Sequence, residues 1–140
     1  MKLLYFPGCT LKTSAKNLEK SAFSIMEKLG HEMKEMDDWT CCGATSAHSL
    51  NGRLAINLPA RNLPEAESMG QDMLVPCPLC FNRLIRAKEE TGSDLNIHDM
   101  ATFMARPKMI ERIKSAITSS LTNISAVCYY GCMANRPPKI

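Results

Sequence analysis

Two cysteines stand side by side in the segment "WTCCGA", at Cys41 and Cys42, and they restrict what this chain can bind. Adjacent side chains of a strand point to opposite faces, and those of a helix lie about 100° apart around its axis. Neither arrangement directs two sulfur atoms at one small ion. The pair, with Gly43 behind it, therefore predicts a bent loop that presents neighbouring thiols to something larger than a single metal ion.

Other cysteines extend this pattern along the chain. In the sequence, 31 residues separate Cys9 from the pair, and 34 residues separate the pair from a C-x-x-C motif at Cys77 and Cys80. A C-x-x-C turn brings two thiolates to one metal site. With Cys128 and Cys132 the chain has seven cysteines, an odd number that excludes complete pairing in disulfides.

Three kinds of site remain open for these cysteines. The first is one zinc ion held by four thiolates, and the second is a thioredoxin-like dithiol at Cys77 and Cys80. The third is an iron–sulfur cluster, which contains several irons, so that Cys41 and Cys42 can each bind a different one. We favour the cluster, with zinc as the alternative. Packing as a buried free thiol is expected for Cys128 alone.

Apolar runs and helical periodicity alternate along the chain. Strands are predicted at residues 2–6, 31–36 and 72–77, with a strand or turn at 95–100 and a final strand from 123. Helices are predicted from 15 to 29 with a cap at Ser14, from 79 to 92, and from 107 to 121. A loop at 39–52 is followed by short helical pieces, because Pro59 and Pro64 prevent one unbroken helix.

The alternation of strands and helices predicts an α/β fold with a mostly parallel, open, Rossmann-like sheet flanked by helices. Binding sites in such sheets form at the carboxyl ends of the strands. Cys9, Cys77 and Cys128 each follow a predicted strand. We therefore expect the cysteine site at this edge of the sheet.

Composition excludes several classes of partner. A net charge of +3 without a Lys/Arg run argues against nucleic acid, and no apolar stretch is long enough to span a membrane. The start "MKLLYFPGC" lacks the pattern of a secretory signal. We expect a cytoplasmic protein, where cysteine-rich patterns indicate metal binding or redox chemistry.

At these residues the sequence resembles the cysteine-rich CCG domain family. "YFPGC", "DWTCCGA", "NLPARNL" and "VPCPLCFNRL" are most similar to the B subunits of the CoB–CoM heterodisulfide reductases. The resemblance implies a noncubane [4Fe–4S] cluster bound by Cys9, Cys41, Cys42, Cys77 and Cys80, through which the cysteines would serve catalysis. It also implies reductive cleavage of the disulfide of coenzymes M and B, with electrons from a ferredoxin-like iron–sulfur subunit.

The segment "CYYGCMANRPP" (128–138) resembles the start of a second CCG motif. We therefore expect a cluster domain at 1–122 and an incomplete second motif at 123–140, from a truncated, split or short relative. Cys132 is a further candidate ligand, for a cluster completed by another chain. The alternatives are an electron-transfer CCG domain accompanying succinate, glycolate or lactate oxidation, and a zinc-stabilised interaction domain.

The remaining polar and aromatic residues have plainer expectations. We expect Trp39 to pack beneath the Cys41 loop and His98 to cap or pack. We expect His31 and His48 to face solvent. The basic residues of the predicted 79–92 helix are interpreted as a solvated face, with charge compensation of the cluster by Arg83 or Arg86 as the minority interpretation.

Overall fold

Four short parallel strands form the centre of the molecule. The computed structural model describes residues 1–44, 47–129 and 131–135, and of His48 the backbone only. The strands are β1 (Lys2–Tyr5), β2 (Glu32–Glu35), β3 (Met73–Val75) and β4 (Ile97–Asp99), in the order β2-β1-β3-β4. All three pairings are parallel, with Leu3 opposite Met33 in the first, Leu4 opposite Met73 in the second and Leu74 opposite His98 in the third. The predicted α/β fold with an open parallel sheet is confirmed.

Both faces of the sheet are buried, as the apolar sequence of β1 requires. Side chains alternate along a strand, so Leu3 packs on one face while Leu4 and Phe6 pack on the other. All three are fully buried. A strand buried on both sides is apolar at every position, and this explains why "LLYF" reads as a continuous run.

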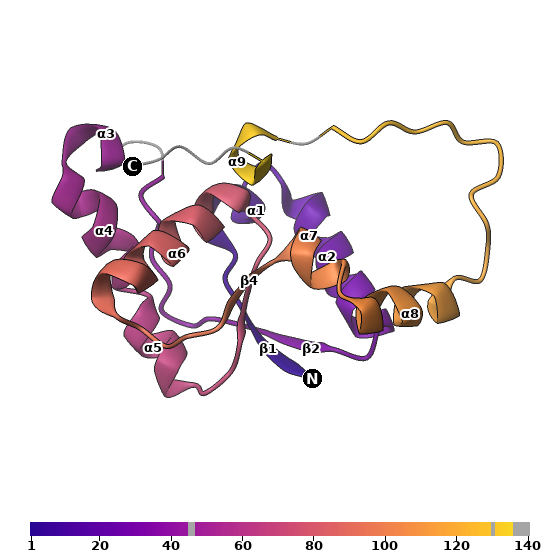
Figure 1. Cartoon of the computed structure of the whole chain (residues 1–140), viewed down its shortest axis with the longest axis horizontal. Helices are drawn as coiled ribbons and strands as arrows, with labels where there is room; N and C mark the ends of the chain where they lie inside the picture. Colours follow the sequence, from indigo (N-terminus) through magenta and orange to yellow (C-terminus); the bar gives the residue numbers. More distant parts are fainter. Residues whose placement is uncertain (45–46, 130, 136–140) are drawn as a thin grey trace.

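One layer of helices covers the face with Leu4 and Phe6 (Figure 1). It contains α3 (Ala47–Leu50), α4 (Gly52–Ala60), α5 (Leu63–Ser68) and α6 (Pro78–Thr91). Asn51 caps α4 by accepting hydrogen bonds from the backbone amides of Arg53 and Leu54, at 2.8 and 3.3 Å. Helix α6 ends at Gly92, whose φ of 71° is the left-handed conformation of a helix C-cap.

The second layer covers the face with Leu3 (Figure 1). It contains α2 (Lys16–Lys28), α7 (Met100–Met104) and α8 (Pro107–Ala116). Met26, Phe103 and Met109 fill the space between these helices and the sheet. Two further helices, α1 (Gly8–Lys12) and α9 (Cys132–Asn135), lie near the carboxyl ends of the strands (Figure 1). No helix in the described ranges is long and apolar enough to cross a membrane.

Several sequence predictions of local structure were wrong. Helices α1, α3 and α7 were not predicted, and α3 lies within the expected loop at 39–52. Ser14 does not cap α2, which begins after Ala15 without a side-chain cap. The last predicted helix ends at Ala116 because Ile117 is extended, with ψ of 118°.

The predicted strand from 123 is also wrong for the residues that are described there. Residues 124–129 form no strand, and Ile124, Val127 and Tyr129 are exposed. A single strand needs a neighbour with which to exchange backbone hydrogen bonds, and this segment runs away from the sheet (Figure 1). Cys128 is therefore exposed rather than buried.

Candidate metal centre

Three strands deliver five cysteines to the same edge of the sheet. Cys9 follows β1 on helix α1, the Cys41–Cys42 pair follows β2 in a loop, and Cys77 and Cys80 follow β3 at the start of α6. Strand β1 lies between β2 and β3, so the chain leaves it on both sides. Open α/β sheets bind ligands where the strand order reverses in this way.

The inner part of the site contains three sulfur atoms. The Sγ atoms of Cys42 and Cys80 lie 3.1 Å apart and share a hydrogen bond, although the residues are 38 positions apart in the sequence. The Cys77 side chain also hydrogen bonds to Cys80. Cys42 and Cys80 are buried, and Cys77 is half-buried.

Cys9 and Cys41 form the outer part of the site, and both are exposed. Burial of the Cys41 sulfur raises the pKa of this thiol, and the neighbouring Cys42 and Cys9 raise it further. Electrostatic influence of this kind falls off within a few ångströms in a protein. The titration of Cys41 therefore links the outer cysteines to the inner three.

The inner thiols differ sharply in acidity. The hydrogen bond from Cys80 lowers the pKa of Cys77 to about 6 and that of Cys42 to about 7, against the opposing effect of burial. The hydrogen bonds to Cys42 and Cys77, together with burial, raise the pKa of Cys80. The site thus stabilises thiolates at Cys42 and Cys77, and thiolates are the form that binds metal.

Backbone amides surround these sulfur atoms. The Gly43 amide donates to Cys41 Sγ at 3.4 Å, and the amides of Leu79 and Cys80 donate to Cys77. Cys77 is the N-cap of α6, where unpaired amides and the helix dipole favour negative charge. Amide hydrogen bonds to sulfur stabilise an anionic thiolate group and tune the potential of a bound cluster.

Two glycines allow the backbone to approach the site closely. Gly8 has φ of 65°, and a Cβ atom at this position would lie 2.7 Å from Cys80 Sγ. Gly43 has φ of 70°, and a Cβ atom there would lie 3.0 Å from Ala47 Cβ. Both positions combine a conformation that favours glycine with a lack of space for any side chain.

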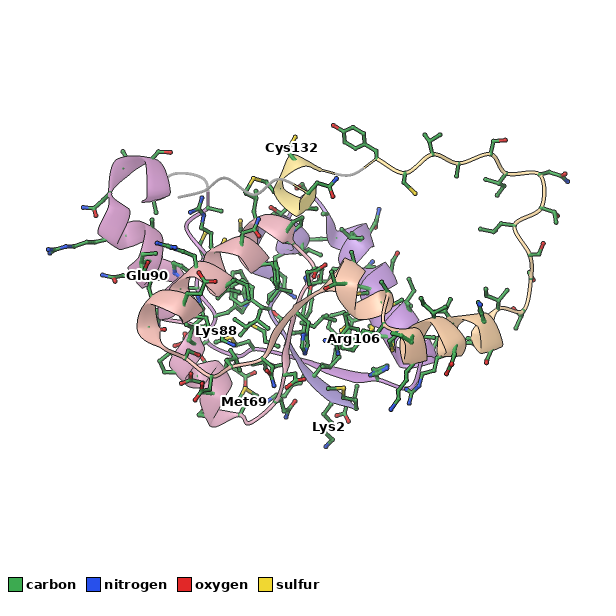
Figure 2. The ribbon with its side chains drawn as sticks, viewed as in Figure 1. Lys2, Met69, Lys88, Glu90, Arg106 and Cys132 are labelled. Carbon is green, nitrogen blue, oxygen red and sulfur yellow. The ribbon has the colours of Figure 1, made fainter. Side chains whose placement is uncertain are left out.

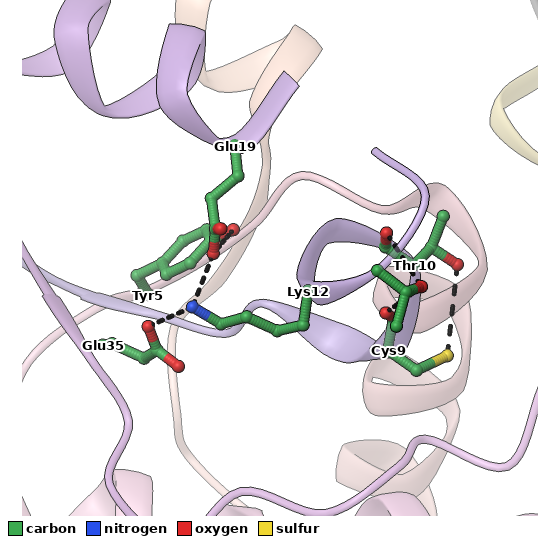
Figure 3. A network of polar contacts seen from close by, with 7 residues as sticks. Tyr5, Cys9, Thr10, Lys12, Glu19 and Glu35 are labelled. Atoms are coloured by element: carbon green, nitrogen blue, oxygen red, sulfur yellow. Dashed lines mark hydrogen bonds and ion pairs between the residues drawn. The ribbon is translucent and has the colours of Figure 1, made fainter. Parts of the chain in front are cut away.

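A partly buried polar network holds α1, and hence Cys9, against the sheet (Figure 3). Lys12 Nζ lies 2.7 Å from Glu19 Oε1 and 2.5 Å from Glu35 Oε2, and the Tyr5 hydroxyl donates to Glu19 at 3.3 Å. The sequence analysis missed this network. Lys12, Glu19 and Glu35 are distant in sequence and meet only because α1 and α2 fold over β1 and β2, so no local pattern could reveal it.

The donor set fits an iron–sulfur group. Five cysteines meet at one edge, three of them hydrogen bonded to one another or to amides, and Gly8 leaves a space that a Cβ atom would fill. Within the described ranges, no three His, Cys, Asp or Glu side chains are arranged to hold one metal ion.

The two remaining cysteines lie outside this group of five. Cys132 is exposed on α9 (Figure 2). The Asn82 side-chain amide donates to the Met133 carbonyl at 2.8 Å and so attaches α9 to α6. Cys128 is exposed in the extended segment that precedes α9.

The aromatic and basic residues gave mixed outcomes. Trp39 packs edge-on against Phe6, at 5.9 Å between ring centres, and His98 packs against Phe103 and pairs with Asp72, as expected. The side chain of His48 lies outside the described residues.

Two expectations of exposure were wrong. His31 is buried, because its ring packs on Phe103 at the end of α2. Arg83 is buried as well, whereas Arg86 lies on the outer side of α6 and pairs with Glu90 at 2.5 Å.

Comparison with known proteins identifies the class to which this arrangement belongs. A model of the cysteine-rich CCG domain matches residues 3–85, a range that contains all five cysteines of the site. The chain therefore belongs to the CCG cysteine-rich domain family, as the sequence resemblance indicated.

The relatives are named as components of reductases. The chain is 32% identical to the 8-methylmenaquinol:fumarate reductase membrane anchor subunit of Wolinella succinogenes, over 96% of this chain and 54% of that protein. It is 24% identical to the B subunit of the ferredoxin/F(420)H(2)-dependent CoB-CoM heterodisulfide reductase of Methanosarcina acetivorans, over 99% of this chain and 53% of that protein. A protein of Archaeoglobus profundus that is named as similar to the heterodisulfide reductase B subunit is also 24% identical, over 91% and 50%. The chain spans about half the length of the curated relatives it matches.

Proposed function

We propose that this chain is an iron–sulfur redox component that binds a noncubane [4Fe–4S] cluster through Cys9, Cys41, Cys42, Cys77 and Cys80. The observation that carries the proposal is the contact between Cys42 and Cys80, 3.1 Å apart, with Cys41 directly beside Cys42 on the outer side. One member of the adjacent pair is buried and the other is exposed. This arrangement suits a group that has several metal atoms better than it suits one zinc ion.

The residues of the chain hold such a group and protect it. Cys77 and Cys42 provide thiolates at neutral pH, and the amides at the start of α6 stabilise negative charge. Phe6 and Trp39 pack in the same apolar cluster as Cys42 and Cys80 and limit the access of water to them. When bound, an iron–sulfur cluster accepts and donates single electrons.

The reaction that we propose is the reductive cleavage of a disulfide, CoM-S-S-CoB or a similar compound. Two electrons and two protons convert the disulfide into two thiols. Electrons would come from a ferredoxin-like iron–sulfur subunit, and the rest of the second CCG motif, which begins near Cys128 and Cys132, would complete the catalytic unit. The heterodisulfide reductase relatives support this proposal. A cytoplasmic location stays a prediction.

A second candidate is electron transfer without disulfide chemistry, next to a quinol-linked or succinate-, glycolate- or lactate-oxidising enzyme. The observation that favours it is the higher identity, 32% against 24%, to the fumarate reductase anchor protein. Both candidates use the same cluster site and differ in the electron acceptor.

Separate replacement of the adjacent cysteines tests the proposed ligands. Cys41→Ser and Cys42→Ser are each expected to lose iron and sulfide after anaerobic purification, because each thiolate binds a different iron. Cys128→Ser is the matched control, since this cysteine is exposed and far along the chain. If both replacements kept the wild-type iron content, the proposed role of the pair would be wrong.

Oxidation of the reduced, cluster-loaded chain separates the two candidates. Rapid oxidation by the heterodisulfide, followed by the EPR signal of the cluster, would support disulfide cleavage. Oxidation by a menaquinone analogue alone would support the second candidate. Zinc without sulfide in the purified chain would instead support the interaction domain.

A further inference from the structure

Helix α6 carries a buried arginine one turn after a cysteine of the site. Arg83 is 3% exposed, as is Cys80, and both lie on the buried side of α6 with Leu84 and Ala87. Arginine is rarely buried unless its charge is compensated, because its guanidinium stays protonated at every relevant pH. Arg83 therefore needs an anion close by.

No carboxylate side chain in the described part of the chain provides this anion. All 14 Asp and Glu residues lie within the described ranges, and none of their ion pairs involves Arg83. The Nε atom of Arg83 is buried and has no hydrogen-bond partner among the described residues. A buried charge that lacks a partner carries a large cost in folding free energy.

The cysteine site is the source of negative charge nearest along this helix face. Residues three positions apart on a helix are neighbours, and helical side chains lean toward the N-terminal turn. The Arg83 side chain thus starts toward the turn that carries Cys80, whose sulfur contacts Cys42. Helix α4 and the end of the Cys42 loop pack against this side of α6 and shield it from water.

We propose that Arg83 is a positioning residue that supplies the buried positive charge for the anionic iron–sulfur group. This inference rests on the proposed function. Arg83 transfers no electron or proton; it stabilises the more negative, reduced form of the cluster relative to the oxidised form. It thereby raises the reduction potential and favours assembly of the loaded site.

The test compares Arg83→Met, Arg83→Lys and the control Arg86→Met, which removes an exposed arginine from the same helix. The iron and sulfide content of the wild-type chain is measured first. The midpoint potential of each loaded variant is then determined by an EPR-monitored redox titration. Arg83→Met is expected to shift the midpoint to a more negative potential, Arg83→Lys to keep it near the wild-type value, and Arg86→Met to leave it unchanged.

Thermal unfolding of the metal-free variants separates this role from a structural one. Arg83→Met is expected to unfold at the same or a higher temperature than the wild type, because it removes an uncompensated buried charge. If Arg83→Met folds but takes up no iron, recovery of iron in Arg83→Lys supports the proposal, and continued loss overturns it.

Three results would overturn the inference while the proposed function stands. The first is a midpoint shift no larger than that of Arg86→Met, and the second is unfolding of the metal-free Arg83→Met chain. The third is an unchanged potential with a raised KM for an anionic substrate, which would make Arg83 a substrate-binding residue. A wild-type chain without iron and sulfide would instead overturn the proposed function, and this inference with it.

Discussion

A Cβ atom on Gly8 would lie 2.7 Å from the sulfur of Cys80, so the turn after β1 rests directly against a cysteine that follows β3. The two residues are far apart in sequence and meet because β1 and β3 are neighbours in the sheet. Only glycine fits here, because the position has both a positive φ and no free space. This contact joins Cys9, the residue after Gly8, to the inner part of the site.

We predict that Gly8→Ala displaces Cys80 and reduces the iron content of the purified chain. Gly92→Ala is a matched control, because Gly92 has a similar φ of 71° but nothing within 4 Å of an added Cβ. The control is expected to lose roughly 1 kcal/mol of unfolding free energy from backbone strain and to keep its iron. Chemical denaturation and iron analysis measure both effects, and equal iron in the two variants would contradict the prediction.

The acidity of the thiols predicts an order of alkylation in the reduced, metal-free chain. At pH 7 the Cys77 thiol, with a pKa of about 6, is mainly thiolate, whereas the raised pKa of Cys41 keeps that thiol protonated. Iodoacetamide is therefore expected to label Cys77 before Cys41, although Cys41 is the more exposed. Peptide mass spectrometry at successive times measures the order. Faster labelling of Cys41 at pH 7 would show that exposure rather than acidity controls reactivity.

Burial of His31 predicts a loss of stability in mild acid. Burial, the N-terminal amino group and Arg112 lower the pKa of His31 below its usual 6.5. The unfolded chain then binds a proton more readily than the folded chain, so stability falls as the pH drops below about 6.5. Denaturant midpoints between about pH 5 and 7 should fall less steeply in His31→Leu than in the wild type. Identical slopes would mean that His31 does not titrate differently on folding.

The position of Cys132 leads to a prediction about the tail. Helix α9 is attached to α6 through the hydrogen bond from Asn82 to the Met133 carbonyl. Asn82→Leu should release α9 and increase proteolytic cleavage within residues 117–131, with little change in iron content. Limited proteolysis followed by mass spectrometry measures this effect. A large loss of iron in this variant would place the tail in the first cluster site instead.

The sequence could predict much of the framework, because strand ends are local features. The run "LLYF" stops at Pro7-Gly8, and "MLV" stops at Pro76, so the positions of Cys9 and Cys77 after strands were foreseeable. The order β2-β1-β3-β4 was not, because strand pairing depends on contacts between distant segments. The 3.1 Å contact between Cys42 and Cys80 follows from that order.

Two failures have distinct physical causes. The spacing of Cys80, Arg83 and Ala87 places them on one side of a helix, but the charge of Arg83 argued for solvent. Burial won because the surrounding helices enclose that side. The segment from 123 has strand-forming residues such as Ile124 and Val127, yet a strand forms only beside a partner.

Metal analysis of the anaerobically purified chain tests the central claim most directly. The account predicts about four irons and about four sulfides per chain, without zinc, and the characteristic EPR signal of a noncubane cluster. It also predicts that Cys42→Ser loses this content while Cys128→Ser keeps it. One zinc per chain with no sulfide would contradict the account.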